Sequence, residues 1–171
     1  LGVTKQGLFQ VDGDNTLSGM IFVPHVNGDY GVWGLRKFLR ELNIKVAIHS
    51  GEKPKLLPIA EAAWAEAKYE ESRKFKTDQV PVIVCTKSYG MGIDKPNVRY
   101  TTHIGIPNSI ESFYQEAGRA ARDRQDAYCT IIFSDDNPAT AAHLLASTTD
   151  IEEIQKKVLP GRDRIKWENQ D

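Results

Sequence analysis

The sequence predicts an α/β protein built on a mostly parallel sheet with helices on both faces. Short apolar segments alternate along the chain with longer segments whose apolar residues recur at helical spacing. This alternation is typical of βαβ units, whose strands run parallel. The apolar segments 20–23 and 82–84 are continuous, as strands covered on both faces are. Right-handed crossovers would place the carboxyl ends of such strands along one edge, where ligands bind.

Five segments are expected to form the strands. Each is rich in Ile, Val, Phe or Thr and is bounded by Gly, Pro, Asp or Ser. The five are Met20–Pro24, Lys45–His49, Val82–Thr86, Arg99–Ile106 and Tyr128–Phe133. The segment Leu8–Val11 is a weaker candidate for a further strand, within an amino-terminal stretch that contains Gly, Asp and Asn.

Three helices are expected between these strands. Apolar residues at helical spacing predict the first over Asp29–Leu42 and the second over Pro58–Phe75. The third is expected to begin at Asn108, because Glu111 follows three residues later as in a capping box. Its helical pattern continues to Arg124. Residues 137–171 also have a helical pattern.

Composition limits the kind of protein this can be. The 171 residues suit one domain, or one domain with a tail. With 22 Lys and Arg against 23 Asp and Glu, the net charge is −1, which excludes nucleic-acid binding through bulk positive charge. No apolar run is long enough for a transmembrane helix, and no secretory signal is present. Because the chain opens at Leu1 rather than Met, we expect a processed or excised piece of a longer protein. We expect that protein to be intracellular: cytoplasmic, or nuclear if eukaryotic.

Residues 108–124 concentrate polar side chains at helical spacing. On a continuous helix four of them would share one face, opposite an apolar stripe: Gln115, Gly118, Arg119 and Arg122. Glycine costs about 1 kcal/mol in a helix relative to alanine, and close approach of another group is its usual justification. An amide and two guanidiniums around that gap would suit a phosphate chain. The alternative is a solvated face whose arginines pair with Glu116 or Asp123.

A second concentration, residues 85–96, directly follows the predicted strand at Val82. Its Thr, Ser and Gly residues would expose hydroxyls and backbone N–H groups, which hold phosphates without net charge. Asp94 offers a carboxylate that accepts hydrogen bonds from a ribose. The alternative is an ordinary turn in which glycine supplies positive φ.

Other common sites are missing from the sequence. There is no GxxxxGK(S/T) phosphate loop, no acidic magnesium box and no nucleophile elbow. The four histidines lack metal-ligand spacing, and His103, in a predicted strand, is expected to be a buried neutral imidazole. Cys85 and Cys129 are too few for a four-cysteine zinc site and are expected to be buried thiols.

Taken together, these segments resemble the motifs of superfamily 2 helicases in their RecQ-like form. Residues 86–99, TKSYGMGIDKPNVR, resemble motif V, and residues 106–123, IPNSIESFYQEAGRAARD, resemble motif VI. Residues 19–24 are similar to motif IV and residues 49–51 to motif IVa. The resemblance spans residues 19–134 in the family's order. Ala121 and Arg124 depart from it, since the RecQ pattern commonly has glycine at both positions.

The resemblance implies a RecA-like three-layer fold and the second motor lobe of an ATP-dependent DNA helicase or translocase. In that family ATP with Mg²⁺ lies between two lobes, and the first lobe, absent here, brings the phosphate loop and the metal ligands. The implied catalytic residues are Arg122 as the arginine finger, Arg119 as a second phosphate contact and Gln115 in ordering the cleft. The implied nucleotide contacts are Gly90, Gly92 and Asp94. The implied nucleic-acid contacts are Ser50, Gly51, Thr86 and Lys87.

The resemblance also implies an organisation and partners. Residues 1–18 would be a connector or edge element, residues 19–136 the lobe, and residues 137–171 a helical extension. The expected partners are DNA, with RNA as the alternative, and the N-terminal lobe of the same parent chain; no membrane is expected. Two other functions stay open: a non-catalytic regulatory or protein-binding module on the same fold, and an RNA helicase lobe. The isolated piece is expected to be inactive and to bind nucleic acid weakly.

Overall fold

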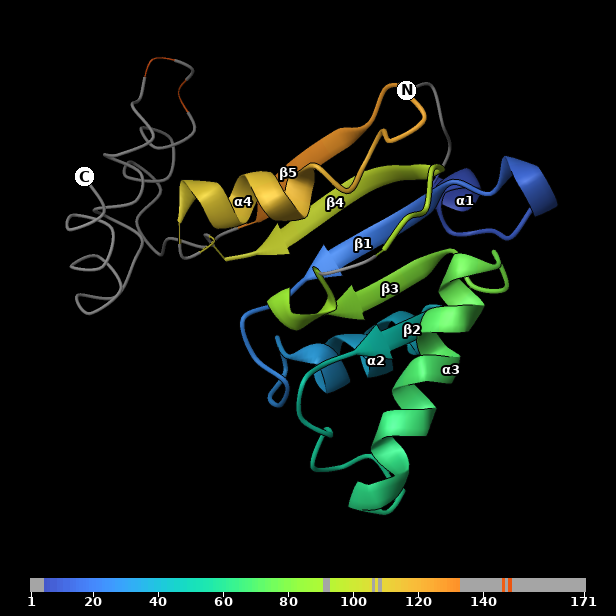
Figure 1. Cartoon of the computed structure of the whole chain (residues 1–171), viewed down its shortest axis with the longest axis vertical. Helices are drawn as coiled ribbons and strands as arrows, with labels where there is room; N and C mark the ends of the chain where they lie inside the picture. The colour runs from blue at the N-terminus through green and yellow to red at the C-terminus, as the bar shows by residue number, and fades with distance from the viewer. Residues whose placement is uncertain are drawn as a thin grey trace.

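A computed structural model describes residues 5–90, 93–105, 107, 109–132, 146 and 148 of the chain. Five strands form one sheet there, in the order β2-β3-β1-β4-β5, and all neighbouring strands are parallel (Figure 1). They are β1 (Ser18–Phe22), β2 (Val46–His49), β3 (Val82–Cys85), β4 (Val98–Ile104) and β5 (Tyr128–Ile132). The predicted α/β class and all five main strands are therefore confirmed.

Four helices and three short 3₁₀ turns connect the strands of the described part. The helices are α1 (Lys5–Leu8), α2 (Val32–Glu41), α3 (Trp64–Lys76) and α4 (Ile110–Ala117). The turns are η1 (Gly13–Asn15), η2 (Glu61–Ala63) and η3 (Lys87–Gly90). Residues 133–145, 147 and 149–171 lie outside the described residues, and so does most of the expected helical extension.

The expected strand at Leu8–Val11 is wrong. Leu8 ends helix α1, and residues 9–11 join no ladder. The Leu8 carbonyl instead accepts a hydrogen bond from the Tyr100 hydroxyl at 3.2 Å, and the Phe9 ring meets the Tyr100 ring edge-on. Side-chain packing against β4 therefore takes the place of strand pairing.

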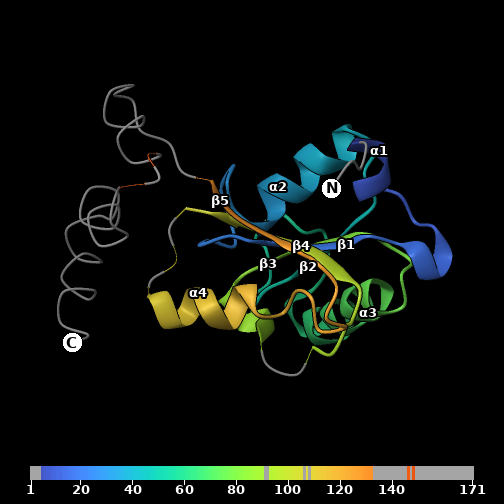
Figure 2. The same ribbon diagram turned by 90° about the horizontal axis from the view of Figure 1, so that it is seen from above.

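The sheet is the middle of three layers, as predicted. Figure 2 shows α1 and α2 on one side of it and α3 and α4 on the other. Successive strand residues point to opposite faces, so Ile21 joins the apolar cluster that contains Val32 of α2. Met20 joins the opposite cluster, which contains Phe75 of α3. Burial on both faces explains why the apolar runs of β1 and β3 are continuous.

The carboxylate of Glu71, in α3, connects edge strand β2 to helix α2. The Ile48 amide donates to Glu71 Oε2 at 3.1 Å. Arg36 of α2 lies 3.5 Å from Glu71 Oε1, and Lys74 lies 3.3 Å from it. Burial lowers the pKa of Arg36, while Glu71 acts in the opposite direction. Glu71 thus satisfies an edge amide and compensates a buried guanidinium at the same time.

Candidate nucleotide and nucleic-acid site

Helix α4 is shorter than predicted, and this changes the geometry of the arginines. It begins after Ser109, whose hydroxyl accepts from the Ser112 amide at 2.9 Å, and it ends at Ala117; Asn108, the expected start, lies outside the described residues. Gly118 is the C-cap. The prediction that Gln115, Arg119 and Arg122 share one face of a continuous helix is therefore wrong, because the helix ends before both arginines.

A tertiary hydrogen bond explains the early end of the helix. The Ala121 amide donates to the carbonyl of Val98, the first residue of β4, at 3.1 Å. Ala121 reaches this position with φ 59°, and Arg124 follows with φ 64°. Both are the positions where the RecQ pattern commonly has glycine. The left-handed backbone, which glycine adopts at least cost, is thus retained here by residues with side chains.

Arg122 pairs with the loop that the sequence assigned to the nucleotide. Its Nη1 lies 3.3 Å from Asp94 Oδ1 and donates to it. The Arg122 side chain is 39% exposed and the Asp94 side chain 88% exposed. Water screens such a pair, so it is worth about 1 kcal/mol at most and exchanges easily for a stronger anion. The arrangement leaves a guanidinium at the surface beside residues 93–94.

Arg119 lies beside this pair but is buried. Only 9% of the residue is exposed, and its Nε has no hydrogen-bond partner in the described part of the chain. Burial lowers the pKa of Arg119, and the nearby charge of Arg122 lowers it further. Two neighbouring cations, one with an unmet donor, would both be stabilised by a bound polyanion.

Beneath the arginines, His103 and Glu116 form a buried contact that the sequence did not predict. His103 is buried as expected, with its ring stacked on Phe22 at 5.0 Å and edge-on to Phe113. Its Nδ1 lies 3.1 Å from Glu116 Oε2, although the two are not aligned as a hydrogen bond. The close contact of the Glu116 carboxylate is therefore with His103, while its charge also acts on Arg119 and opposes the lowering of the pKa of that guanidinium by burial.

The alternative in which Arg119 and Arg122 pair with Glu116 or Asp123 is also wrong, because neither carboxylate forms an ion pair with these arginines in the described part of the chain. Asp123 accepts a hydrogen bond from Arg99, and this lowers the pKa of the Asp123 carboxyl. Gln115 donates to Glu111 at 3.1 Å along the exposed side of α4. The Gln115 side chain is therefore exposed and bonded to Glu111 in the arrangement observed.

The predicted nucleic-acid residues meet at the carboxyl ends of β2 and β3. The Thr86 amide donates to the His49 carbonyl at 3.2 Å, and the Thr86 and Ser88 hydroxyls lie 2.8 Å apart. A Cβ on Gly51 would lie 3.9 Å from Ser88. Gly51, Lys87 and Ser88 are exposed. Thr86 is partly exposed, so this end of the sheet offers hydroxyls, an ammonium and open backbone together.

Ser50 is placed differently from its neighbour Gly51. Its side chain is fully buried, and its hydroxyl donates to the Glu52 carbonyl at 2.5 Å. In this arrangement the hydroxyl shapes the turn that presents Gly51. Gly90 ends η3, whereas Gly92 lies outside the described residues.

Two groups of candidate site residues lie at different ends of the strands. The arginine group consists of Arg119, Arg122 and Asp94, and the nucleic-acid group consists of Gly51, Thr86 and Lys87. The arginine turn is hydrogen-bonded to the amino end of β4, whereas Thr86 and Gly51 follow the carboxyl ends of β3 and β2. The turn that carries Arg122 therefore lies near the amino end of β4 and not at the carboxyl edge, where the sequence predicts that ligands bind. Residues 86–95 connect the two groups, since they contain both Thr86 and Asp94.

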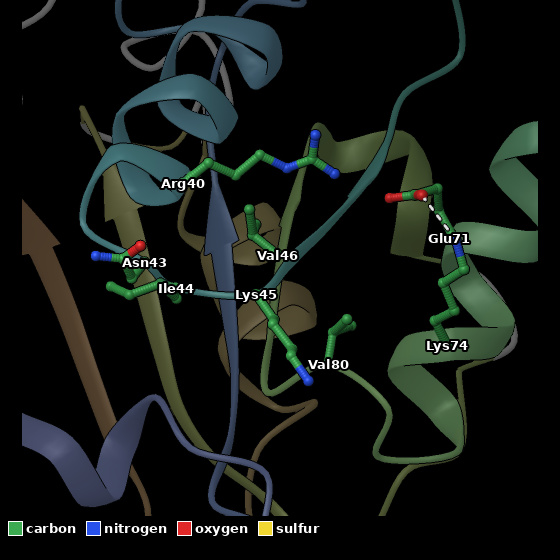
Figure 3. Close-up of a pocket in the computed structure, with 8 residues that line it drawn as sticks. All are labelled: Arg40, Asn43, Ile44, Lys45, Val46, Glu71, Lys74 and Val80. Carbon is green, nitrogen blue, oxygen red and sulfur yellow. Dashed lines mark hydrogen bonds and ion pairs between the residues drawn. The ribbon is translucent and has the colours of Figure 1, made fainter.

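Figure 3 shows a pocket of about 280 Å³ that is separate from both groups. It lies at the amino end of β2, between the last turn of α2 and α3, and Arg40, Lys45 and Lys74 bring cations to it. Lys74 is already paired with Glu71. No residue assigned to a site from the sequence lines this pocket.

The described residues contain no group of three or more His, Cys, Asp or Glu side chains placed to hold a metal ion. Cys85 is buried, and burial raises the pKa of its thiol. Cys129 is exposed, so the expectation of two buried thiols is wrong for it. It lies on the edge strand β5, whose outer side has no neighbouring strand in the described sheet.

Residues 8–124, more than half of the chain, match the sequence pattern of the helicase conserved C-terminal domain. The chain belongs to this family. Its RecQ-like character is confirmed by curated relatives. It is 39% identical over 94 residues to the ATP-dependent DNA helicase RecQ of Bacillus subtilis, covering 55% of this chain and 16% of that protein. It is 44% identical over 66 residues to the RecQ-like DNA helicase BLM of Xenopus laevis, covering 39% and 5%.

The match therefore spans no more than 16% of the length of either relative. Solved structures show the same fold. Domain 2 of the DEAD-box helicase Mss116p, bound to an RNA duplex, has a TM-score of 0.54 at 20% identity, over 84% of this chain and 56% of that one. The yeast DEAD-box splicing factor Prp28 has a TM-score of 0.56 at 18% identity, over 91% and 32%. Among the described residues, no helix is long and apolar enough to cross a membrane.

Proposed function

We propose that this helicase C-terminal domain is the second motor lobe of an ATP-dependent DNA helicase or translocase, and that Arg122 is its arginine finger. The observation that carries the proposal is the exposed contact of Arg122 with Asp94, beside the buried Arg119 with its unmet Nε. An arginine that reaches the γ-phosphate stabilises charge in the transition state, an effect of about 10³–10⁵ in rate for related nucleotidases.

The described residues fit one side of a nucleotide site. Asp94 suits a ribose hydroxyl, Gly90 would provide backbone close to the phosphates, and Arg119 would complete the phosphate contacts. A role of Gly92, which lies outside the described residues, rests on the resemblance alone. ATP bound with Mg²⁺ supplies the phosphoryl group that is hydrolysed. The resemblance implies that the metal ligands and the phosphate loop would come from the first lobe. Closure of the two lobes would place Arg122, which couples hydrolysis to lobe movement.

The carboxyl ends of β2 and β3 would contact the nucleic-acid backbone. Thr86, Lys87 and Gly51 present a hydroxyl, an ammonium and open backbone, the groups that bind phosphates irrespective of sequence. Ser50 would act by holding the turn that presents Gly51. The named DNA helicases among the relatives support DNA as the substrate.

RNA is the second candidate substrate, because the fold is shared with Mss116p domain 2, which is bound to an RNA duplex. Strand separation by the parent enzyme on matched DNA and RNA duplexes decides between them. We expect faster unwinding of DNA. Equal or faster unwinding of RNA would overturn the DNA assignment.

The proposed lobe comprises residues 19–136, with residues 1–18 as a connector and residues 137–171 as an extension. Its incompleteness gives a direct test. The 171-residue chain alone should neither hydrolyse ATP nor unwind DNA, and addition of the first lobe should restore DNA-stimulated hydrolysis. Robust turnover by the isolated chain would refute the proposed division of the site. A parent whose first lobe lacks a phosphate loop would instead favour the non-catalytic module.

A further inference from the structure

A pocket of about 310 Å³ lies between α3 and the residues that follow β3. Helix α3 contributes Lys68, Tyr69 and Lys76 to its lining. His49, Ser88 and Tyr89 line it from the carboxyl ends of β2 and β3. This pocket is distinct from the one in Figure 3, which lies at the amino end of β2. None of the arginine group lines it.

One buried polar atom at this pocket lacks a partner, since Nδ1 of His49 has no hydrogen-bond partner in the described residues. Only 5% of Tyr89 is exposed; burial raises the pKa of its hydroxyl to about 12, and a hydrogen bond with Ser72 acts in the opposite direction. The two rings are in contact, with centroids 4.4 Å apart. The Ser72 hydroxyl nearby donates to the Lys68 carbonyl at 2.7 Å. Buried polar groups are nearly always hydrogen-bonded, so the unmet His49 nitrogen at this pocket points to a ligand.

The basic side chains of α3 that line this pocket are unpaired in the described part of the chain, whereas the other basic side chains of the helix form ion pairs within it. Arg73 pairs with Glu70, and Lys74 pairs with Glu71. Lys68 and Lys76 line the pocket, and neither ammonium makes an ion pair with any described residue. The charge of Lys68 adds to burial in lowering the pKa of His49. The pocket is therefore a locally positive part of a chain whose net charge is −1.

The mouth of the pocket adjoins the proposed nucleic-acid contacts. Ser88 lines the pocket, and its hydroxyl lies 2.8 Å from the Thr86 hydroxyl. A Cβ on Gly51 would be 3.9 Å from the same residue. Tyr69, also in the lining, is 68% exposed. An exposed aromatic ring beside unpaired ammonium groups is the usual combination for single-stranded nucleic acid.

We propose that this pocket receives one nucleotide of a DNA single strand whose backbone crosses Gly51 and Thr86. The base stacks on Tyr69, and the flanking phosphates lie against Lys68 and Lys76. This inference rests on the proposed function, since it extends the same nucleic-acid path from the ends of the strands onto α3.

Binding of a fluorescein-labelled oligothymidine to the 171-residue chain at low ionic strength tests the proposal. We expect Tyr69→Ala to raise Kd about tenfold through loss of stacking. Lys68→Gln and Lys76→Gln should each reduce the slope of log K against log salt by about 0.7, the value for one lost phosphate contact on a single strand. Circular dichroism melts would establish that the variants are folded.

Matched controls come from residues away from the pocket. Tyr30 is 73% exposed, and Lys37 is exposed on α2, so Tyr30→Ala and Lys37→Gln should leave Kd and the salt slope unchanged. An unchanged Kd for Tyr69→Ala, with weaker binding by Thr86→Ala and Lys87→Ala, would overturn the pocket and leave the proposed function standing.

Two further outcomes separate the remaining possibilities. Absence of any binding by the unaltered chain would overturn the pocket and the proposed nucleic-acid surface together. Thymidine monophosphate should compete far more weakly than the oligonucleotide at equal phosphate concentration. Equal competition would identify a free-nucleotide site and contradict the proposal.

Discussion

Arg122 donates a hydrogen bond to Asp94 at 3.3 Å, although 28 residues separate them in the sequence. This contact joins the turn after α4 to the segment after β3, the two segments that carry the resemblance to motifs VI and V. It is exposed to water and therefore weak. In the proposed function, Asp94 is the counter-ion of Arg122 that a nucleotide would replace.

Removal of that counter-ion should affect nucleotide binding more than turnover. In the parent enzyme, Asp94→Ala should raise KM for ATP about tenfold, the effect of losing one charge-assisted hydrogen bond to a ribose. The kcat should change only a few-fold, because Arg122 remains. Steady-state hydrolysis at saturating DNA measures both quantities. An unchanged KM would exclude Asp94 as a ribose contact.

The left-handed backbone at Ala121 predicts a stabilising substitution. Since φ is 59° there, Ala121→Gly should relieve steric strain and raise the free energy of unfolding by about 0.5–1 kcal/mol. Urea titration followed by circular dichroism measures the change. The matched control is Ala117→Gly at the last residue of α4, which should lower stability by up to about 1 kcal/mol. If both variants are destabilised alike, the positive φ at Ala121 carries no strain.

Glu71 should be far more important for stability than its neighbour Glu70. Glu71→Gln weakens the contacts with a buried guanidinium and an edge amide, so a loss of about 3 kcal/mol is expected. Glu70→Gln removes only an exposed pair with Arg73, which water screens, and should leave the stability almost unchanged. Equal losses in thermal or urea unfolding would contradict the role of Glu71 at the sheet edge.

The burial of His49 predicts a loss of stability in mild acid. Burial lowers its pKa from 6.5 to about 4, so between these values the unfolded chain binds a proton that the folded chain does not. Stability should therefore fall as the pH drops from 6.5 towards 4. Because His49 is only partly buried, we expect a contribution of about 1 kcal/mol at pH 5.

The variants His49→Gln and His25→Gln separate this contribution from that of other titrating groups. The first should flatten the dependence of the unfolding free energy on pH between 4 and 6.5. The second replaces an exposed histidine and should retain the dependence of the unaltered chain. Superimposable profiles for all three proteins would show that His49 does not titrate differently on folding.

The strands could be predicted from the sequence because their signal is local. Apolar runs such as that of β3, bounded by Pro81 and Thr86, have few alternatives in a chain of alternating segments. The end of α4 could not be predicted in this way, since helical spacing continues through Arg122. A hydrogen bond from Ala121 to Val98, in another element, determines where the helix stops.

The site was predictable only where motifs identified it. The contact of Arg122 with Asp94 joins two segments that their residue types already identified in the sequence, residues 108–124 and 85–96. Neither the contact of Glu116 with His103 nor the pocket at Tyr89 has a local signal, because each joins elements whose proximity depends on the order of the strands.

The central claim is that Arg122 stabilises the transition state of ATP hydrolysis. The most direct test is DNA-stimulated hydrolysis by the parent enzyme carrying Arg122→Ala, with ATP binding measured separately by titration of a fluorescent analogue. We predict that kcat falls by about 10³-fold or more while the affinity for ATP changes only a few-fold. An unchanged kcat, or a loss confined to ATP affinity, would contradict the claim.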